Sequence, residues 1–346
     1  MSETNLLVKL GWQAFFQQQL TLDEWEDCIP ARIVEQHKTQ ISVSTEHGLH
    51  TISLTPSMID MVVGDWILLG SDFTFIRLLE RKTYFARKAA GSHVKQQLIS
   101  ANVDVAFIVT SVNDDFNLNR IERFLALVNE AGAEPVVILS KSDLSLTPEI
   151  FVEKIRAIDP LLTVEMLNCL DSKSCIKLKP WLNEGSTCVM LGSSGVGKST
   201  LTNTLLGKAL QTTSDIRNDD AKGRHTTTGR SLFYTDSGGL ILDTPGMREI
   251  QLSDCKSGIV STFNDIDVLS MECQFKDCQH QQEPGCRVQQ AIDEGLLDNR
   301  RLNNYLKLLN EESRNSASLS ERRANDKALG KYYKKTQHQA SKFKGR

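Results

Sequence analysis

Residues 192–200 read GSSGVGKST and hold the strongest chemical pattern in the chain. They fit GxxxxGK[ST], follow an apolar run that ends at Leu191 and precede a helical stretch. Glycines let backbone N–H groups curl around phosphates at a helix N-terminus, Lys198 supplies positive charge, and Ser199 offers a hydroxyl to Mg²⁺. A plain glycine-rich turn is the weaker alternative. The predicted phosphate-binding residues are Gly192, Ser193, Ser194, Gly195, Val196, Gly197, Lys198, Ser199 and Thr200.

A second motif, SKSD at residues 140–143, follows another apolar run and resembles the NKxD guanine-reading motif. The Asp143 carboxylate would accept two hydrogen bonds from guanine N1–H and the N2 amino group, which adenine lacks, and the Lys141 stem would cover the base. Ser140 stands where Asn is usual, which predicts weaker nucleotide affinity. The alternative is a polar turn with an N-cap Asp. The predicted base-binding residues are Ser140, Lys141, Ser142 and Asp143.

Two elements after the phosphate loop have the character of GTPase switches. GRHTTT at residues 223–228 would be switch I, in which Thr227 or Thr228 completes Mg²⁺ coordination and His225 is a candidate for positioning the attacking water. DTPG at residues 243–246 would be switch II, in which Asp243 holds the ion through water and the Gly246 N–H meets the γ-phosphate. Met247 follows where many GTPases have Gln. We therefore expect slow intrinsic hydrolysis.

The order of the motifs along the chain is unusual. SKSD comes first, then Asn168 and Cys169 where the loop behind the base usually reads Ser-Ala, then the phosphate loop and the two switches. This is the GTPase set in circularly permuted order. It keeps one sheet and one pocket, but it makes switch II the covalent lead into the C-terminal part, so nucleotide state would move that part.

Three cysteines and a histidine crowd into residues 273–286 as C-x4-C-x-H-x5-C. Three thiolates and one imidazole are the ligand set of a closed tetrahedral structural zinc site. Buried free cysteines are the alternative, which the tight spacing disfavours. We predict one zinc ion per chain, bound by Cys273, Cys278, His280 and Cys286, that folds a segment poor in apolar residues.

The elements that would position these residues fall into three domains, which a chain of 346 residues at 40% hydrophobic content can supply with separate cores. Short alternating strands at 41–44, 50–54 and 66–69 predict an N-terminal β-barrel. Apolar runs at 105–109, 135–139, 163–167, 187–191 and 240–242 alternate with helical stretches such as 118–131, which predicts a parallel α/β sheet. Residues 291–309 predict one amphipathic helix. The predicted domains span residues 1–92, 93–254 and 255–346.

The charge distribution and hydropathy of the chain limit the kinds of partner that it can have. The formal net charge is −3, yet residues 320–346 carry nine Lys or Arg against two acidic residues. Residues 81–95 carry five Lys or Arg and no acidic residue, with Tyr84 and Phe85 interleaved. Both segments favour RNA contact over solvated, unpartnered chain. No apolar run is long enough for a membrane span and no signal-peptide pattern begins the chain, so we expect a soluble cytoplasmic protein.

These motifs together resemble the RsgA (YjeQ/EngC) family of ribosome small-subunit-dependent GTPases over nearly the whole chain. GSSGVGKST, GRHTTT, DTPGM and the C-x4-C-x-H-x5-C cluster stand in that family's order. The resemblance implies an OB-fold barrel, a circularly permuted GTPase domain and a zinc-binding helical module. It implies a late role in small (30S) subunit assembly, with Mg²⁺-dependent GTP hydrolysis stimulated by that subunit, contacts to its rRNA and assembly factors, no membrane or DNA partner, and a monomeric chain.

Three functional classes stay open on the residues alone. They are a ribosome-assembly GTPase, a nucleotide-gated RNA-binding module with negligible turnover, and a P-loop ATPase or kinase with an attached zinc module. Asp143 argues against the third class, because its carboxylate selects guanine. Met247 is compatible with either of the first two.

Overall fold

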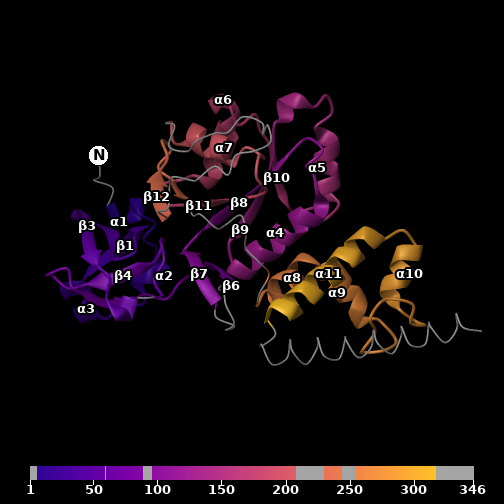
Figure 1. Ribbon diagram of the computed structural model, residues 1–346, viewed down its shortest axis with the longest axis horizontal. Coiled ribbons are helices and arrows are strands. Elements are labelled where there is room, and N and C mark those ends of the chain that lie inside the picture. The colour runs from indigo at the N-terminus through magenta and orange to yellow at the C-terminus, as the bar shows by residue number, and fades with distance from the viewer. Residues whose placement is uncertain are drawn as a thin grey trace, which may run out of the picture.

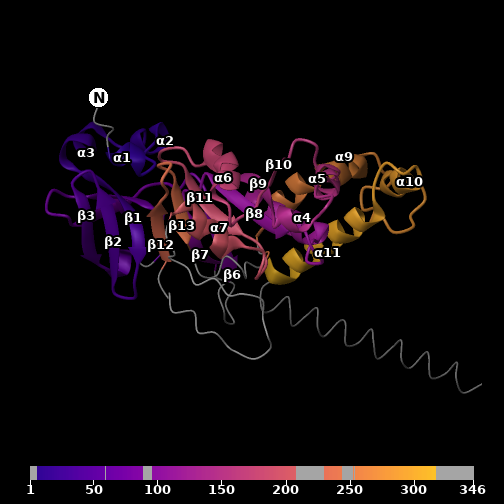
Figure 2. The same cartoon turned by 90° about the horizontal axis from the view of Figure 1, so that it is seen from above.

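The structure is a computed structural model that describes residues 6–58, 60–88, 96–207, 230–243, 252 and 254–316. Three parts follow one another along its longest axis (Figure 1). The N-terminal β-rich part lies at one end, the α/β part occupies the middle, and the C-terminal helices lie at the other end; the view from above shows the same succession (Figure 2).

The N-terminal part is a five-stranded antiparallel sheet in the order β3-β2-β1-β4-β5, with short helices beside it. Its elements are α1 (Leu6–Lys9), α2 (Ala14–Gln17), α3 (Leu22–Asp27), β1 (Ile29–Gln36), β2 (Gln40–Thr45), β3 (Gly48–Ser53), η1 (Pro56–Met58), β4 (Trp66–Leu69) and β5 (Phe75–Leu78). The predicted short strands are confirmed. Leu10, Phe16 and Trp66 are almost fully buried together, so the segment before the sheet belongs to the core.

Two features join this part to the α/β part. Strand β1 pairs with β12 (Arg230–Tyr234), where Glu35 lies opposite Ser231. The Arg32 guanidinium, 1% exposed, donates to the backbone carbonyls of Leu10 and Asn102. Because burial disfavours the charged form, the pKa of Arg32 falls to about 10, still well above neutral pH. This buried cation fixes the N-terminal helices, β1 and the start of the α/β part to one another.

The α/β part is built on six strands in the order β10-β9-β8-β11-β13-β12. These are β8 (Val105–Ser111), β9 (Glu134–Ser140), β10 (Thr163–Met166), β11 (Thr187–Leu191), β12 and β13 (Leu240–Asp243). All neighbours except β12–β13 pair in parallel. The remaining elements are the hairpin β6 (Tyr84–Lys88) and β7 (Gln96–Ala101), and the helices α4 (Leu118–Ala131), η2 (Ser142–Leu144), α5 (Glu149–Arg156), α6 (Ser172–Cys175), η3 (Ile176–Trp181) and α7 (Lys198–Leu205).

This order places β11 between β8 and β13, inside the parallel strands, although β8, β9 and β10 precede it in the chain. The carboxyl ends of β8, β9, β11 and β13 therefore meet at one edge, the side where open α/β sheets bind ligands. Ser111, Ser140, Leu191 and Asp243 end these strands, so the predicted motifs converge at that edge.

The C-terminal part contains α8 (Lys256–Thr262), α9 (Asn264–Met271), α10 (Arg287–Asp293) and α11 (Asn299–Ser316). The prediction of one helix over residues 291–309 is wrong, because the chain breaks between α10 and α11. Gly295 takes a left-handed conformation, with φ of 72°, directly after α10. The Asp298 side chain then accepts from the Arg300 N–H and starts a new helix. Helical periodicity continues through the break, which hid it from the sequence.

Among the residues that the structure describes, no helix is long and apolar enough to cross a bilayer.

Candidate nucleotide site and metal centre

The phosphate-binding loop connects β11 to α7, and its glycines are required by its backbone. Gly192 has φ of 142°, and a Cβ there would lie 2.3 Å from the Val109 carbonyl oxygen of β8. Gly195 and Gly197 have φ of 83° and 99°, in the region that favours glycine, and nothing lies within 4 Å of a Cβ built on Gly195. The loop thus packs against β8 on one side and is open on the other, as a cradle for phosphates requires.

Lys198 opens α7 and shapes the loop from within. Its side chain is buried, and the Nζ atom donates to the carbonyl of Gly192 at 2.7 Å and to that of Ser193. These bonds hold the ammonium group inside the loop rather than in solvent. Ser194 and Gly195 at the tip are exposed, while Ser199 and Thr200 are half-buried in the first turn of α7.

The structure brings SKSD next to this loop. Ser140 ends β9 with 0% exposure, and its hydroxyl lies 2.6 Å from the Val196 carbonyl and 3.1 Å from the Thr110 carbonyl. Because the hydroxyl has one proton, it donates to one carbonyl at a time. Lys141 turns the chain with a left-handed φ of 56°, and Asp143 is exposed in η2. Ser140 therefore supplies the contact to the phosphate loop.

The predicted loop behind the base also lies in contact with these elements. The Thr204 hydroxyl of α7 donates to the Cys169 carbonyl at 2.7 Å, and the Cys169 sulfur lies 3.8 Å from where a Gly197 Cβ would stand. Burial, together with the neighbouring Cys175, raises the pKa of Cys169 to about 12. The thiol thus stays neutral and serves as packing.

Asp243 ends β13 at the same edge and is partly buried. The other predicted switch residues lie outside the described part of the chain: His225, Thr227, Thr228, Gly246 and Met247.

The sequence reasoning missed two residues, Asp115 and Arg120, that bind the phosphate loop through a side chain. The Ser193 hydroxyl donates to Asp115 Oδ2 at 2.7 Å, and Arg120 Nη1 lies 2.7 Å from the same hydroxyl and 2.8 Å from both Asp115 oxygens. Burial acts to raise the pKa of Asp115, but the bonds from Arg120 and Ser193 and the charge of Lys141 outweigh it and lower that pKa. One signal was available, because an acidic residue just past a parallel strand lies at the ligand-binding edge.

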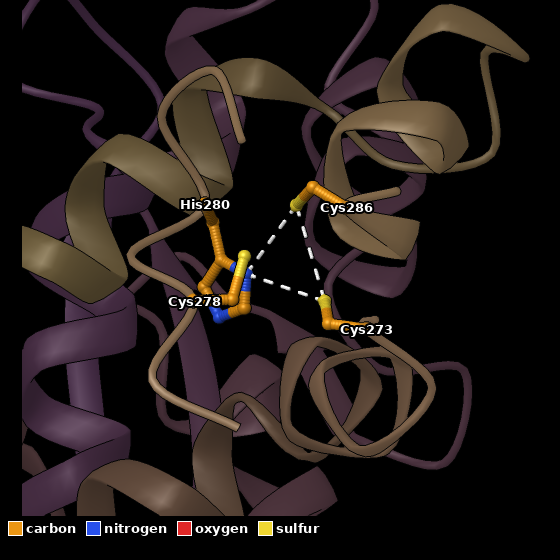
Figure 3. Close-up of side chains that lie close together, drawn as sticks. All are labelled: Cys273, Cys278, His280 and Cys286. Carbon is orange, nitrogen blue, oxygen red and sulfur yellow. Dashed lines mark hydrogen bonds between the residues drawn. The ribbon is translucent and has the colours of Figure 1, made fainter. Parts of the chain in front are cut away.

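The four predicted metal ligands converge on one point (Figure 3). Their ligand atoms all lie within 4.8 Å of one another, with His280 Nδ1 3.6 Å from Cys273 Sγ and 3.5 Å from Cys286 Sγ, and 3.9 Å between these two sulfurs. Zinc bonds of about 2.3 Å to sulfur and 2.0–2.1 Å to nitrogen, at tetrahedral angles, require about 3.8 Å between sulfurs and about 3.6 Å between sulfur and nitrogen. Three of the four ligand atoms therefore stand at the separations that such an ion requires, and Cys278 Sγ lies within 4.8 Å of them.

A glycine-rich phosphate loop, a guanine-type motif beside it and an interior strand that comes late in the chain define a class: P-loop GTPases of circularly permuted order. The sequence profile of the RsgA GTPase family matches residues 78–253. The small ribosomal subunit biogenesis GTPase RsgA 2 of Vibrio parahaemolyticus is 52% identical over 331 residues, 96% of this chain and 92% of the relative. RsgA of Mesorhizobium japonicum is 44% identical and covers 90% of this chain and 91% of its own. The chain belongs to the RsgA GTPase family.

Solved structures agree in fold. YjeQ from Thermotoga maritima superposes with a TM-score of 0.59 at 26% identity, over 82% of this chain and 98% of its own. YloQ, described as a circularly permuted GTPase, gives 0.59 at 23% identity over 86% and 96%. The predicted family, fold class and enzyme class are confirmed.

Proposed function

We propose that this chain hydrolyses GTP to GDP and phosphate in the late assembly of the small (30S) ribosomal subunit, to check maturation or release assembly factors. The observation that carries the proposal is the joining of SKSD to the phosphate loop through the Ser140–Val196 bond of 2.6 Å. This contact supports a role for the nearby Asp143 carboxylate in selecting guanine next to a phosphate cradle. The names of the RsgA relatives supply the biological process.

In this proposal the chain's own residues bind and orient the nucleotide. Loop N–H groups and Lys198 hold the β- and γ-phosphates, and Asp143 and Lys141 hold the base. Ser199, Asp243 and a switch I threonine, Thr227 or Thr228, would bind Mg²⁺, which supplies charge stabilisation at the transferred phosphoryl group. His225 would position water and the Gly246 N–H would meet the γ-phosphate. Slow turnover in the absence of a partner follows from Met247, which has no polar group to align water.

The metal of the Cys3His group is zinc in this proposal, because three thiolates and one imidazole at the measured separations suit a closed tetrahedral site. All four coordination positions come from the chain, so the ion has a structural role.

RNA contact is assigned to the β6–β7 hairpin and the basic tail. In the hairpin, Tyr84 is exposed and Arg87 donates to the neutral side chain of Gln97. An exposed aromatic ring close to positive charge suits a nucleic-acid base and backbone. Charge reversal of Arg87 and Lys88 should weaken subunit binding, while intrinsic GTP turnover stays unchanged. Unaltered binding would reject the assignment.

The test of the proposed function is steady-state hydrolysis of GTP and ATP by the full chain, alone and with small or large ribosomal subunits, at low and high salt. Stimulation of GTP turnover by small subunits alone supports it. Tight GTP binding without stimulation would instead indicate a nucleotide-gated RNA binder, and equal turnover of ATP would reject the base assignment.

A further inference from the structure

Helix α4 lies between the nucleotide site and the C-terminal helices. Its N-terminus follows β8 at the ligand-binding edge, and α8 and α11 run beside it on the other side (Figures 1 and 2). The start of α4 therefore lies near both the nucleotide site and the C-terminal helices, which are far apart in sequence.

On the nucleotide side, Arg120 and Asp115 hold the phosphate loop by the Ser193 side chain. The three groups form a closed set of hydrogen bonds of 2.7–2.8 Å, and both charged side chains are little more than a third exposed. Charge-assisted bonds of this length are stronger than neutral ones. The Ser193 carbonyl also accepts from Lys198, so Asp115, Arg120 and the phosphate-binding lysine all act on the same residue.

On the opposite side, Glu122 anchors the C-terminal part. Its carboxylate is 0% exposed and accepts from Arg300 at 2.9 and 3.0 Å, from Arg301 at 2.8 Å and from Asn304 at 2.5 Å, all at the start of α11. The next residue of α4, Arg123, makes a bidentate pair with Glu311 at 2.6 and 2.7 Å.

The backbones themselves are in contact further along α4. A Cβ on Gly258 of α8 would lie 2.1 Å from the Ala126 carbonyl oxygen, and the Gly258 N–H donates to Glu130 at 2.7 Å. Helices packed this closely shift together rather than slide independently. A displacement of α4 therefore carries α8 and α11 with it.

We propose that Asp115, Arg120 and Ser193 form a latch through which the phosphate loop and the zinc-bearing part of the chain sense each other across α4. The inference rests on the proposed function, because it requires nucleotide at the phosphate loop. It differs from transmission along the covalent link after switch II, since it passes through side chains of a helix that precedes the loop in the chain. Arg120 and Asp115 are thus positioning residues for Ser193.

Such coupling is reciprocal. If nucleotide alters how α4 holds α11, then loosening α11 must alter nucleotide affinity by the same factor, and couplings of this kind typically amount to about 5- to 150-fold. Substitutions that break the latch must abolish both the effect of nucleotide on α11 and the effect of α11 on nucleotide affinity. A purely structural role for Ser193 would change nucleotide affinity without changing its dependence on α11.

The experiment is a double-mutant cycle on the full, zinc-loaded chain. The probe is a fluorescent, non-hydrolysable GTP analogue, and the measured quantity is its Kd. Ser193→Ala removes the latch hydroxyl and Ser193→Thr retains it. Glu311→Gln weakens the hold of α11 on α4, and Glu294→Gln is the matched control, because its partner Arg287 lies in the same C-terminal part. Amide hydrogen exchange of α8 and α11 is measured with and without the analogue.

We expect Glu311→Gln to shift the Kd about five-fold in chains with Ser or Thr at position 193 and not in the Ser193→Ala chain. The analogue should alter exchange in α11 in the first two chains only, and Glu294→Gln should shift the Kd in none. Arg120→Ala should repeat the result of Ser193→Ala, which keeps the test decisive if the loop substitution itself disturbs binding.

An equal shift in all backgrounds would overturn the latch, as would an exchange response that survives both latch substitutions. Those outcomes leave GTP binding intact, so the proposed function stands. If the unsubstituted chain failed to bind the analogue, the proposed function and the latch would fall together.

Discussion

The metal centre and the nucleotide site reach their geometry in different ways. All four metal ligands are side chains within residues 273–286, and the segment has little apolar material of its own. The nucleotide site draws on the ends of β9, β11 and β13 and on the start of α4, and its closest contacts involve backbone carbonyls of a buried sheet. The metal-binding segment therefore depends on its ion to fold, whereas the nucleotide site depends on the folded sheet. The two regions should therefore differ in how much structure each loses when its support is removed.

Metal removal is expected to have the largest effect. Structural zinc contributes about 10–16 kcal/mol of apparent binding free energy at neutral pH in small zinc-folded units, and that energy is folding energy. Chelation, or Cys286→Ser, should unfold the segment around residues 273–299, as seen by limited proteolysis and loss of helical circular dichroism. Cys28→Ser, at a half-buried free cysteine outside the cluster, is the control and should keep one metal ion by elemental analysis.

Metal removal also tests whether the two regions fold separately. One face of the sheet is packed in a core that contains no residue of the C-terminal part, so the chelated chain should still bind GTP. Complete loss of GTP binding upon chelation would mean that the two regions fold as one unit.

The loss of Lys198 comes next in size. Lys198→Ala removes the buried ammonium group that lies inside the loop, and removal of one preorganised donor at a developing charge lowers kcat by about 100- to 1000-fold. Subunit-stimulated kcat is the measurement. Lys177→Ala, which removes an exposed lysine bonded to the Met166 carbonyl, should leave kcat unchanged. A decrease below ten-fold would count against phosphate binding by Lys198.

The same contrast explains what the sequence predicted. Strand β11 and helix α4 have the limits expected from apolar runs and helical period, because each buries a continuous apolar face. The predicted convergence of the Cys3His group is confirmed, since the short spacing of its four residues brings them together. Helix α10 was merged with α11, because amphipathic periodicity persists through Gly295 and only the backbone conformation marks the break.

The motifs of the nucleotide site were recognised in the sequence, but the side chains that support the phosphate loop were not. Gly192 and Lys198 sit in a pattern that phosphate chemistry imposes locally. Asp115 and Arg120 are in no such pattern, and their contact with Ser193 spans more than seventy positions of sequence. Only the pairing of β8 with β11 brings them together. Side-chain supports that depend on strand order are therefore the part that sequence reasoning cannot supply.

Base selectivity offers a finer test of the nucleotide site. Asp143→Asn exchanges one carboxylate acceptor for a donor, so guanine loses a hydrogen bond and xanthine gains one. An unsatisfied polar group costs about 1–3 kcal/mol, which predicts GTP binding weaker by about 5- to 150-fold and tighter XTP binding. Competition between GTP and XTP for a fluorescent analogue measures both. Asp171→Asn keeps an N-cap on α6 nearby and should leave the preference unchanged. Retained GTP preference in the Asp143 variant would refute the base assignment.

The smallest expected effect concerns Ser140, whose hydroxyl connects the base motif to the phosphate loop. Its hydroxyl lies 2.6 Å from the Val196 carbonyl inside a fully buried environment, so Ser140→Ala leaves that carbonyl without this donor. A net hydrogen bond contributes about 0.5–1.5 kcal/mol, which predicts a Kd for GTP higher by about 2- to 12-fold, with the preference for GTP over XTP and the zinc content unaffected. Ser145→Ala removes a hydroxyl five residues on that accepts only a local bond from the Thr147 N–H, and it should not change the Kd. Because chelation acts on the metal-folded region and this change acts on one sheet contact, the Ser140→Ala shift should be the same with and without zinc. If the change in Kd caused by Ser140→Ala depended on zinc, the base motif would also be coupled to the C-terminal part, in addition to the coupling through the latch.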